Sequence, residues 1–411
     1  MRLAVVSPFV DRRHGTERAL TEVIERLARD YHCEIHLYAE RVEDLALEDR
    51  GMTASEASGS ICWHKVPAIP GPHVVKFLGW IVANGIFRWW HRVFRGRSFD
   101  LVLSPGVNCL DADVIIVHVV FQRLWELSRD KRAGKASRLV FFRSLHRRVY
   151  YALLTALERH LYSNPRAVLA AVSPRTADQL QRYFQRGDVH VIPNGVDRRQ
   201  FSISARAGRR EEARRLLRFR ETDFVLLLIG NDWGMKGVPA ILAAMAQLPA
   251  LPLHLVVVGD DVASPFQDTA KRLGIFERCR WIAPRRDVVY FYAAAEIYMS
   301  PSREDSFGLP VAEAMACGLP VITSACAGVS SFIHDGVDGF VVRDPEDTQA
   351  LAGVIERLYD DEALRSRVGE AAAQTAQQWT WDRSAAEVWK LLQGLARIGA
   401  AKDDAMRTQS N

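Results

Sequence analysis

The sequence predicts an α/β fold made of two doubly wound parallel-sheet domains that face each other across a cleft. The chain has 411 residues, more than one hydrophobic core usually organises, so we expect two domains. Short apolar runs alternate with amphipathic stretches along the whole chain, and this alternation is typical of parallel sheets with helices on both faces. The alternation occurs in both halves of the chain, which predicts two such sheets.

The expected strands form one set in each half of the chain. They are residues 2–8, 34–38, 100–103, 114–119, 167–172 and 189–192, then 224–229, 253–258, 279–282, 296–299, 320–323 and 339–342. The charged segment 202–219 has no strand pattern, so we place the domain boundary near it. We therefore expect a first domain at 1–200, a second at 201–380, and a helix at 381–400 that crosses back to the first domain.

Composition indicates a globular protein, because 48% of the residues are hydrophobic and 25% are charged. We find no uninterrupted apolar stretch of about 18 residues or more, so we expect no transmembrane helix. The apolar N-terminal run lacks a small-residue cleavage site and is interpreted as the first strand. The six cysteines include no C-x-x-C pair, which predicts a reducing cytoplasm and neither a disulfide framework nor a zinc site.

Positive charge is concentrated in one region. Between Gly71 and Arg159 the chain has 15 Lys and Arg against 6 Asp and Glu, an excess of +9, whereas the net charge of the whole chain is +5. The same region interleaves arginines with tryptophan, phenylalanine and tyrosine. The aromatic residues expected at a membrane surface are Trp80, Trp89, Trp90, Phe141 and Phe142. This pattern suits an anionic membrane surface. It is equally typical of ordinary helices that pack aromatic residues inward, and nucleic acid is a weaker alternative because no recognised module accompanies the charge.

The most informative segment is SPSREDSFGLPVAEAMACG, residues 300–318. An expected strand ends here, Pro310 suits the first position of a helix, and Gly318 suits the end of that helix. The N-terminus of such a helix favours an anion, and Gly308 permits close approach of the backbone. Asp305 in the loop and Glu313, which we place in the first turn, add hydrogen-bond acceptors for hydroxyl groups. Solvated acids at an ordinary helix start are the alternative.

A second segment, LLIGNDWGMKG at 227–237, places Lys236 in a glycine-rich turn after a strand. Such a lysine suits a diphosphate, although it can also be a solvated loop residue. His118 ends an apolar strand, where a lone histidine is more often a core residue than a functional one. Adjacent aspartates in VVVGDD, residues 256–261, are interpreted as solvated acids.

Together these segments resemble the family 4 retaining glycosyltransferases of GT-B architecture, and the lipopolysaccharide core glucosyltransferases within that family. Two acidic residues framing F-G-L-P form the donor-binding signature of the family. The resemblance implies that Glu313 binds the donor ribose. Asp305 stands where the family usually has glutamate, and Glu304 precedes it, so either acid can meet the donor sugar; we favour Asp305.

The resemblance also assigns the other donor contacts. Lys236 matches the phosphate-binding lysine, and Asn231 stands where an arginine is usual, so another basic residue such as Arg175 is expected to meet the phosphate. His118 matches a histidine that contacts the donor sugar. The expected catalytic group is Asp305, Glu313, Lys236 and His118. The expected donor-binding residues are Gly15, Arg175, Asn231, Arg285, Glu304, Ser306, Phe307, Gly308 and Leu309.

The implied function is transfer of a hexose, with retention at the anomeric carbon, from a nucleotide diphosphate sugar to a hydroxyl group. A UDP-sugar is the expected donor, and an envelope glycan or lipid-linked molecule the expected acceptor. We expect no cofactor, no metal ion and no nucleic acid, and a cytoplasmic protein held peripherally at the inner face of the membrane. The alternatives are a nucleotide-sugar epimerase, or a phosphorylase, on the same scaffold, and a non-catalytic nucleotide-sugar binding protein.

Overall fold

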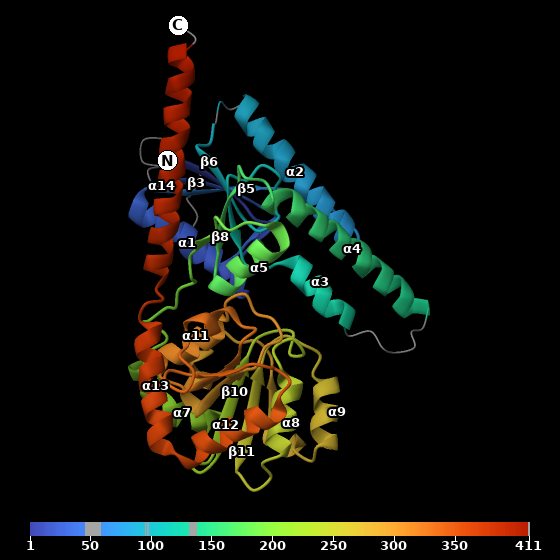
Figure 1. Cartoon of the computed structure of the whole chain (residues 1–411), viewed down its shortest axis with the longest axis vertical. Coiled ribbons are helices and arrows are strands. Elements are labelled where there is room, and N and C mark those ends of the chain that lie inside the picture. Colours follow the sequence, from blue (N-terminus) through green and yellow to red (C-terminus); the bar gives the residue numbers. More distant parts are fainter. Residues whose placement is uncertain (46–58, 95, 97, 131–137, 410–411) are drawn as a thin grey trace. The chain divides into compact units, whose positions relative to one another are not determined.

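The structure is a computed structural model that describes residues 1–45, 59–94, 96, 98–130 and 138–409 (Figure 1). It divides into two compact units. The first combines Met1–Pro193 with Trp381–Asn411, and the second is Asn194–Thr380. No helix within the described part of the chain is both long and apolar enough to span a membrane.

The first unit contains a parallel sheet of seven strands in the order β5–β3–β1–β6–β7–β8–β9. Its strands are β1 (Arg2–Val6), β3 (Glu34–Ala39), β5 (Ile61–Lys65), β6 (Leu101–Pro105), β7 (Val114–Val117), β8 (Val168–Ala171) and β9 (His190–Val191). A separate parallel pair joins β2 (Phe9–Val10) to β4 (Arg41–Val42). The sequence did not predict β2, β4 or β5. Strand β5 has the sequence ICWHK. It lacks a continuous apolar pattern because it lies at the edge of the sheet, where only Ile61 is buried.

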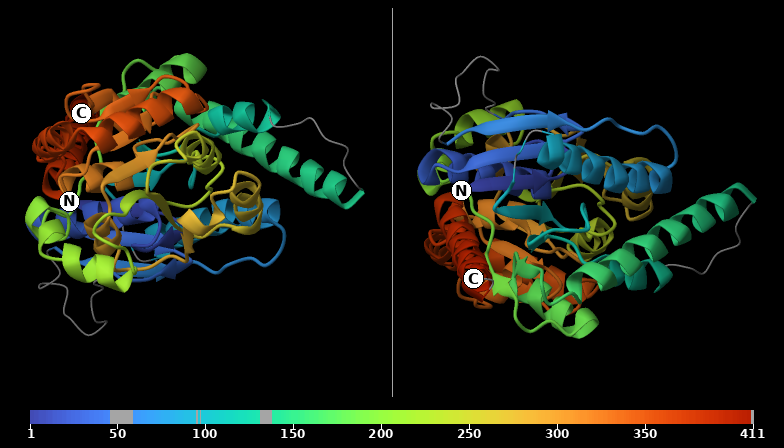
Figure 2. Two further views of the ribbon diagram at one scale, coloured as in Figure 1. Left: turned by 90° about the horizontal axis from the view of Figure 1, so that it is seen from below. Right: turned by 90° about the horizontal axis from the view of Figure 1, so that it is seen from above.

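Within the described residues, the first unit has six helices. They are α1 (Gly15–Tyr31), α2 (His73–Phe94), α3 (Phe121–Asp130), α4 (Arg138–Tyr162), α5 (Pro174–Phe184) and α14 (Trp381–Gln409). Figure 2 shows α3 and α4 side by side, extending away from the sheet of their unit. The buried carboxylate of Glu158 on α4 accepts the backbone N–H of Phe121, at 2.6 Å, and of Gln122, at 2.9 Å. It thereby satisfies free donors at the start of α3.

The long C-terminal helix α14 packs against α1. The rings of Tyr31 and Trp389 lie 5.2 Å apart between centroids, and Arg26 donates to Asp382 at 2.6 Å. Because these contacts join residues more than 350 positions apart in sequence, α14 closes the first unit with the last part of the chain.

The second unit contains a parallel sheet of six strands in the order β12–β11–β10–β13–β14–β15. The strands are β10 (Phe224–Ile229), β11 (Leu253–Val258), β12 (Cys279–Ile282), β13 (Ile297–Ser300), β14 (Val321–Ser324) and β15 (Phe340–Val342). The helices are α6 (Ile203–Ala207), α7 (Arg210–Leu216), α8 (Val238–Ala246), α9 (Ser264–Arg272), α10 (Val289–Ala294), α11 (Leu309–Ala316), α12 (Thr348–Asp360) and α13 (Glu362–Ala376). Two parallel sheets with helices between most consecutive strands confirm the predicted fold class.

The charged segment near the expected boundary forms α6 and α7 and belongs to the second unit. Its arginines are held by that unit: Arg214, which is 6% exposed, donates to Glu296 at 3.0 Å and to the carbonyl of Ala294 at 2.9 Å. Arg210 also pairs with Glu296. The division between the units therefore comes before this segment, between Pro193 and Asn194.

Candidate functional site

Two loops of the second unit meet at one edge of its sheet. One follows β10 and the other follows β13, and these strands are hydrogen-bonded neighbours. Because the strands are parallel, their carboxyl ends lie at the same edge, which is where open α/β sheets bind ligands. The backbone N–H of Arg303 in one loop donates to the carbonyl of Met235 in the other at 2.8 Å.

Glycines make this close approach possible. Gly237 has a φ of +87°, and a Cβ there would lie 2.2 Å from the carbonyl oxygen of Pro301. Gly308, with a φ of +95°, immediately precedes α11; a Cβ on it would lie 3.3 Å from Cγ1 of Val329. Larger residues at these two positions would force the loops apart or strain the backbone.

Lys236 and Asp305 form an ion pair across the two loops. The lysine side chain is 19% exposed and the aspartate side chain 13% exposed, so solvent screens their attraction less than on an open surface. Gly230 leaves room for the lysine stem, because a Cβ there would lie 3.3 Å from Cε of Lys236. A lysine ammonium has three donors, so Lys236 can hold Asp305 and still donate to a ligand.

The helix that follows Gly308 starts at Leu309. Pro310 has no backbone N–H, and the N–H groups of Val311 and Ala312 donate to the carbonyl of Gly308. The aligned peptide dipoles of the helix nevertheless give its N-terminus a partial positive charge. Glu313 is the fifth residue of this helix, so the expectation that it lies in the first turn is wrong. The N-cap position of Gly308 sets the helix start, and Glu313 therefore falls in the second turn.

Glu313 is 3% exposed and accepts a hydrogen bond of 2.8 Å from the hydroxyl of Tyr292 on α10. Burial raises the pKa of Tyr292 well above its usual value, and the Glu313 carboxylate raises it further, so the phenol stays protonated and donates. The sequence did not single out Tyr292, because it lies 21 residues from Glu313 in a short helix without a motif.

The other predicted residues around this loop differ in how far their side chains are exposed. Phe307 is 2% exposed, and its ring packs against Phe332 and Trp379 with centroids 6.5 Å and 6.0 Å away. Because this ring is buried, only the backbone of Phe307 can face a ligand. Leu309 is also buried, whereas Glu304 and Ser306 are partly exposed.

Asn231 and Arg285 lie on the same unit but have structural partners. The side-chain oxygen of Asn231 accepts the N–H of Asp260 at 2.8 Å, which ties the Lys236 loop to the end of β11. Asp261 accepts the N–H of Trp233 at 2.7 Å, so this acid holds the loop rather than merely facing solvent. Arg285 is 56% exposed and pairs with Asp287 at 2.6 Å.

Three expected site residues belong to the first unit. Gly15 is the first, exposed residue of α1. His118 follows the end of β7 and is 7% exposed. Arg175 is the second residue of α5 and partly buried. The structure therefore brings Lys236 and Asp305 into contact within the second unit, and it places these three residues in the other unit.

Both units match glycosyltransferase family models. Residues 209–375 match the model described as "Glycosyl transferases group 1". Residues 13–200 match the model described as "Glycosyltransferase Family 4". The two matches follow the two units and together extend over most of the chain.

Among curated relatives, the chain is 28% identical over 251 residues to a D-inositol 3-phosphate glycosyltransferase of Corynebacterium urealyticum, covering 58% of this chain and 59% of the relative. It is 28% identical over 248 residues to the lipopolysaccharide glucosyltransferase WaaG of Escherichia coli (strain K12), covering 58% of this chain and 66% of the relative. The matches thus span somewhat over half the length of these relatives.

Solved structures share the fold over nearly the whole chain. The crystal structure of WaaG, a glycosyltransferase involved in lipopolysaccharide biosynthesis, matches with a TM-score of 0.75 and 21% identity, covering 95% of this chain and 100% of that one. Anabaena HepE in complex with UDP and glucose matches with a TM-score of 0.69 and 18% identity, covering 96% and 100%. The chain therefore belongs to the family 4 glycosyltransferases and has the GT-B fold.

Proposed function

We propose that the protein transfers a hexose from a nucleotide diphosphate sugar, with a UDP-sugar as donor, to a hydroxyl of an envelope glycan or lipid-linked acceptor, with retention at the anomeric carbon. The observation that carries the proposal is the Lys236–Asp305 pair beside the N-terminus of α11. A cation and the positive end of a helix suit a diphosphate, and the adjacent carboxylate suits sugar hydroxyls. The UDP and glucose bound by HepE and the lipopolysaccharide substrate named for WaaG support these choices.

The positive charges at this site suit a reaction in which the diphosphate leaves from the same face of the sugar on which the acceptor attacks. The bond between the anomeric carbon and the phosphate oxygen breaks, and the acceptor oxygen bonds to the same carbon on that face. The departing phosphate oxygen takes the proton of the acceptor hydroxyl. Lys236 and the N–H groups at the start of α11 would stabilise the negative charge that develops on the diphosphate.

A thermal-shift screen against UDP, GDP and ADP sugars tests the donor, because a ligand that binds only the folded protein raises its Tm. We expect the largest increase with a UDP-sugar. Proton NMR of the product then reports the anomer, which should match the donor. If the protein bound the donor but catalysed neither transfer nor slow donor hydrolysis, it would instead be a non-catalytic binding protein. Release of an epimer of the donor in the absence of acceptor would favour an epimerase.

The two neighbouring acids should differ in their effect on transfer. Asp305 contacts Lys236 and has the spacing of the family motif, so Asp305→Asn should lower kcat at least about tenfold through loss of a charged hydrogen bond. Glu304→Gln is the matched control and should retain most of the activity. A large loss confined to Glu304→Gln would assign the donor sugar to Glu304 instead.

Transfer should need no divalent ion at the donor site, because Lys236 and the start of α11 supply positive charge there. Activity is therefore expected to survive treatment with a chelator. The assay is repeated with Cys62→Ser, which changes a thiol on β5 of the first unit, so that a metal ion bound at that thiol does not confuse the result. Complete loss of transfer activity in both the wild type and Cys62→Ser, restored by Mn²⁺, would show that the donor site requires a metal.

We also propose that the first unit contacts an anionic membrane surface through α2. Side chains at helical spacing on α2 are more than half exposed although they are apolar: Val82 59%, Ile86 55%, Trp89 57%, Val93 54% and Phe94 60%. Aromatic residues favour the interface between water and lipid. Exposed basic residues on α2 and α4 can add attraction to anionic headgroups; they are Lys76, Arg92, Arg147 and Arg148.

Two residues of the basic aromatic region are buried and cannot face a membrane. Trp80 is 2% exposed and donates its indole N–H to the carbonyl of Asn108 at 2.9 Å. Arg88 is 7% exposed and pairs with Asp111 at 2.8 Å. Both face the core because they lie on the buried side of α2. The side chains of Phe141 and Phe142 lie outside the described part of the structure.

Flotation with liposomes tests this surface. Binding should require anionic lipid and fall as salt rises, because each basic residue near the surface contributes about 1 kcal/mol that salt screens. Replacing both Trp89 and Trp90 with Ser should reduce recovery, whereas Val262→Ser, which changes a residue 67% exposed on the second unit, should not. Equal recovery with neutral and anionic vesicles, or none with either, would contradict the proposal.

A further inference from the structure

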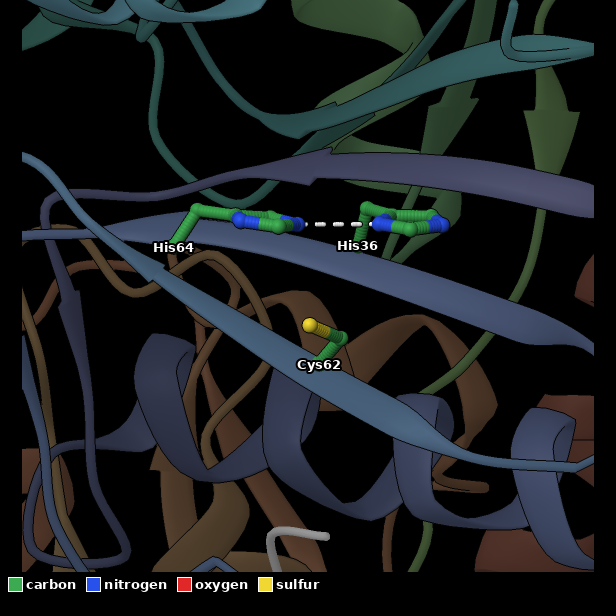
Figure 3. A group of neighbouring side chains, drawn as sticks. All are labelled: His36, Cys62 and His64. Atoms are coloured by element: carbon green, nitrogen blue, oxygen red, sulfur yellow. Dashed lines mark hydrogen bonds between the residues drawn. The ribbon is translucent and has the colours of Figure 1, made fainter. Parts of the chain in front are cut away.

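A cluster of metal-binding side chains lies in the first unit, outside the elements that form the candidate donor site. It consists of His36 on β3 and of Cys62 and His64 on the edge strand β5 (Figure 3). In the parallel register His36 pairs with Cys62, and Tyr38 pairs with His64. Paired residues and residues two apart project from the same face of a sheet, so the three side chains share one face.

The geometry of the three side chains fits a small metal ion. Nδ1 of His36 lies 2.9 Å from Nε2 of His64, and one ligand atom from each residue lies within 4.8 Å of the other two. A tetrahedral zinc ion bound at usual bond lengths separates two imidazole nitrogens by about 3.3 Å and a nitrogen from a thiolate sulfur by about 3.6 Å. Movements on the order of an ångström would therefore bring the three atoms to coordination distance.

The environment of His36 already favours metal binding. Its Nε2 lies 3.0 Å from the Glu34 carboxylate, which is also held by Arg2 at 2.8 Å. When Nε2 donates its proton to Glu34, Nδ1 keeps the lone pair that faces His64. Metal-binding histidines commonly have such a carboxylate partner.

Neighbouring aromatic rings restrict the movement of these side chains. The ring of Phe99 lies 5.1 Å from that of His36, and the ring of Tyr38 lies 4.8 Å from that of His64. His36 is 2% exposed, while Cys62 is partly exposed. The thiol side of the cluster therefore gives an ion a route of entry, and the histidine side is held in place.

We propose that His36, Cys62 and His64 bind a Zn²⁺ ion. Imidazole nitrogen and thiolate sulfur are both ligands that zinc prefers, and with three protein ligands a water molecule would complete the tetrahedron. On binding, the Cys62 thiol releases its proton to solvent, and His64 carries its proton on Nδ1 so that Nε2 faces the metal. The ion would attach the edge strand β5 to β3. The sequence predicted no zinc site, because the ligands lie on two strands and show no C-x-x-C spacing.

Full-length protein purified without a histidine tag tests the proposal. Competition with a chromophoric chelator should show one Zn²⁺ bound per chain, and Zn²⁺ should raise the Tm. Co²⁺ in place of Zn²⁺ should give a thiolate-to-cobalt charge-transfer band together with intense visible bands of a tetrahedral site. Cys62→Ser should abolish the charge-transfer band, and Glu34→Gln should weaken Zn²⁺ binding by about 10–100-fold.

Two control variants separate this site from general surface binding. His190→Gln changes an exposed histidine of the same unit, and Cys326→Ser changes another partly exposed thiol; both should bind Zn²⁺ as the wild type does. Absence of stoichiometric binding to the folded wild type, or equal affinity in Cys62→Ser, would overturn the proposal. The cluster would then be a pair of hydrogen-bonded histidines beside a thiol. Because the wild-type cobalt spectrum is itself a readout, the test remains decisive if a variant fails to fold.

Discussion

Lys236→Met is expected to lower kcat for sugar transfer by about 10²–10³-fold, the loss typical when one donor to a developing negative charge is removed. Lys236 is expected to hold the diphosphate as its bond to the sugar breaks, and its contribution should increase as charge accumulates on the leaving group. Methionine keeps the length and the apolar stem but removes the charge. Steady-state kinetics with saturating acceptor gives kcat and the donor KM separately.

The matched control is Lys271→Met. Lys271 also pairs with an acid, Asp268 at 3.7 Å, but its side chain is 57% exposed, so its loss should leave kcat within about twofold, as exposed ion pairs contribute little. If Lys236→Met retained wild-type kcat, the leaving group would have to be stabilised by other residues.

Stability provides a second control for the same variant. Lys236→Met leaves the carboxylate of Asp305, 13% exposed, without its cation, and such a loss is destabilising for a poorly solvated charge. Adding Asp305→Asn removes that charge and should restore part of the lost stability. The double variant should nevertheless remain as slow as Lys236→Met or slower. Recovery of both stability and kcat in the double variant would mean that Lys236 stabilises the folded protein but takes no part in catalysis.

Glu313→Ala is expected to weaken donor binding by about 1.5–3 kcal/mol, which corresponds to roughly 10–150-fold in Kd. The carboxylate is 3% exposed, and we expect it to accept hydrogen bonds from the donor ribose while Tyr292 holds it in place. Isothermal titration calorimetry with the donor identified by the thermal-shift screen measures the effect directly.

Tyr292→Phe separates positioning from direct contact. It removes the hydroxyl that donates to Glu313 at 2.8 Å but leaves the carboxylate, so the loss of affinity should be smaller than in Glu313→Ala. Glu362→Ala changes an acid whose side chain is 85% exposed in the same unit and should have no effect. Unchanged donor affinity in folded Glu313→Ala would exclude this residue from the donor site.

The sequence determined the fold class and many strand positions. Expected strands at 224–229 and 253–258 have the bounds of β10 and β11, because central strands of a parallel sheet are buried on both faces and form continuous apolar runs. The start of α11 was also predictable, since Gly308 and Pro310 occupy positions with strict backbone requirements. An edge strand such as β5 gives no such signal, because polar residues remain on its partly exposed side.

Only the tertiary structure decided which side chains meet. Lys236 and Asp305 are 69 positions apart and pair because β10 and β13 are neighbours in the sheet. On α2, the sequence assigned Trp80 and Trp89 to the same basic aromatic surface, yet they are 2% and 57% exposed. The His36, Cys62 and His64 cluster likewise depends on the pairing of β3 with β5. Local sequence sets backbone conformation and periodic burial, whereas strand order and helix packing determine the distances between side chains on which binding and catalysis depend.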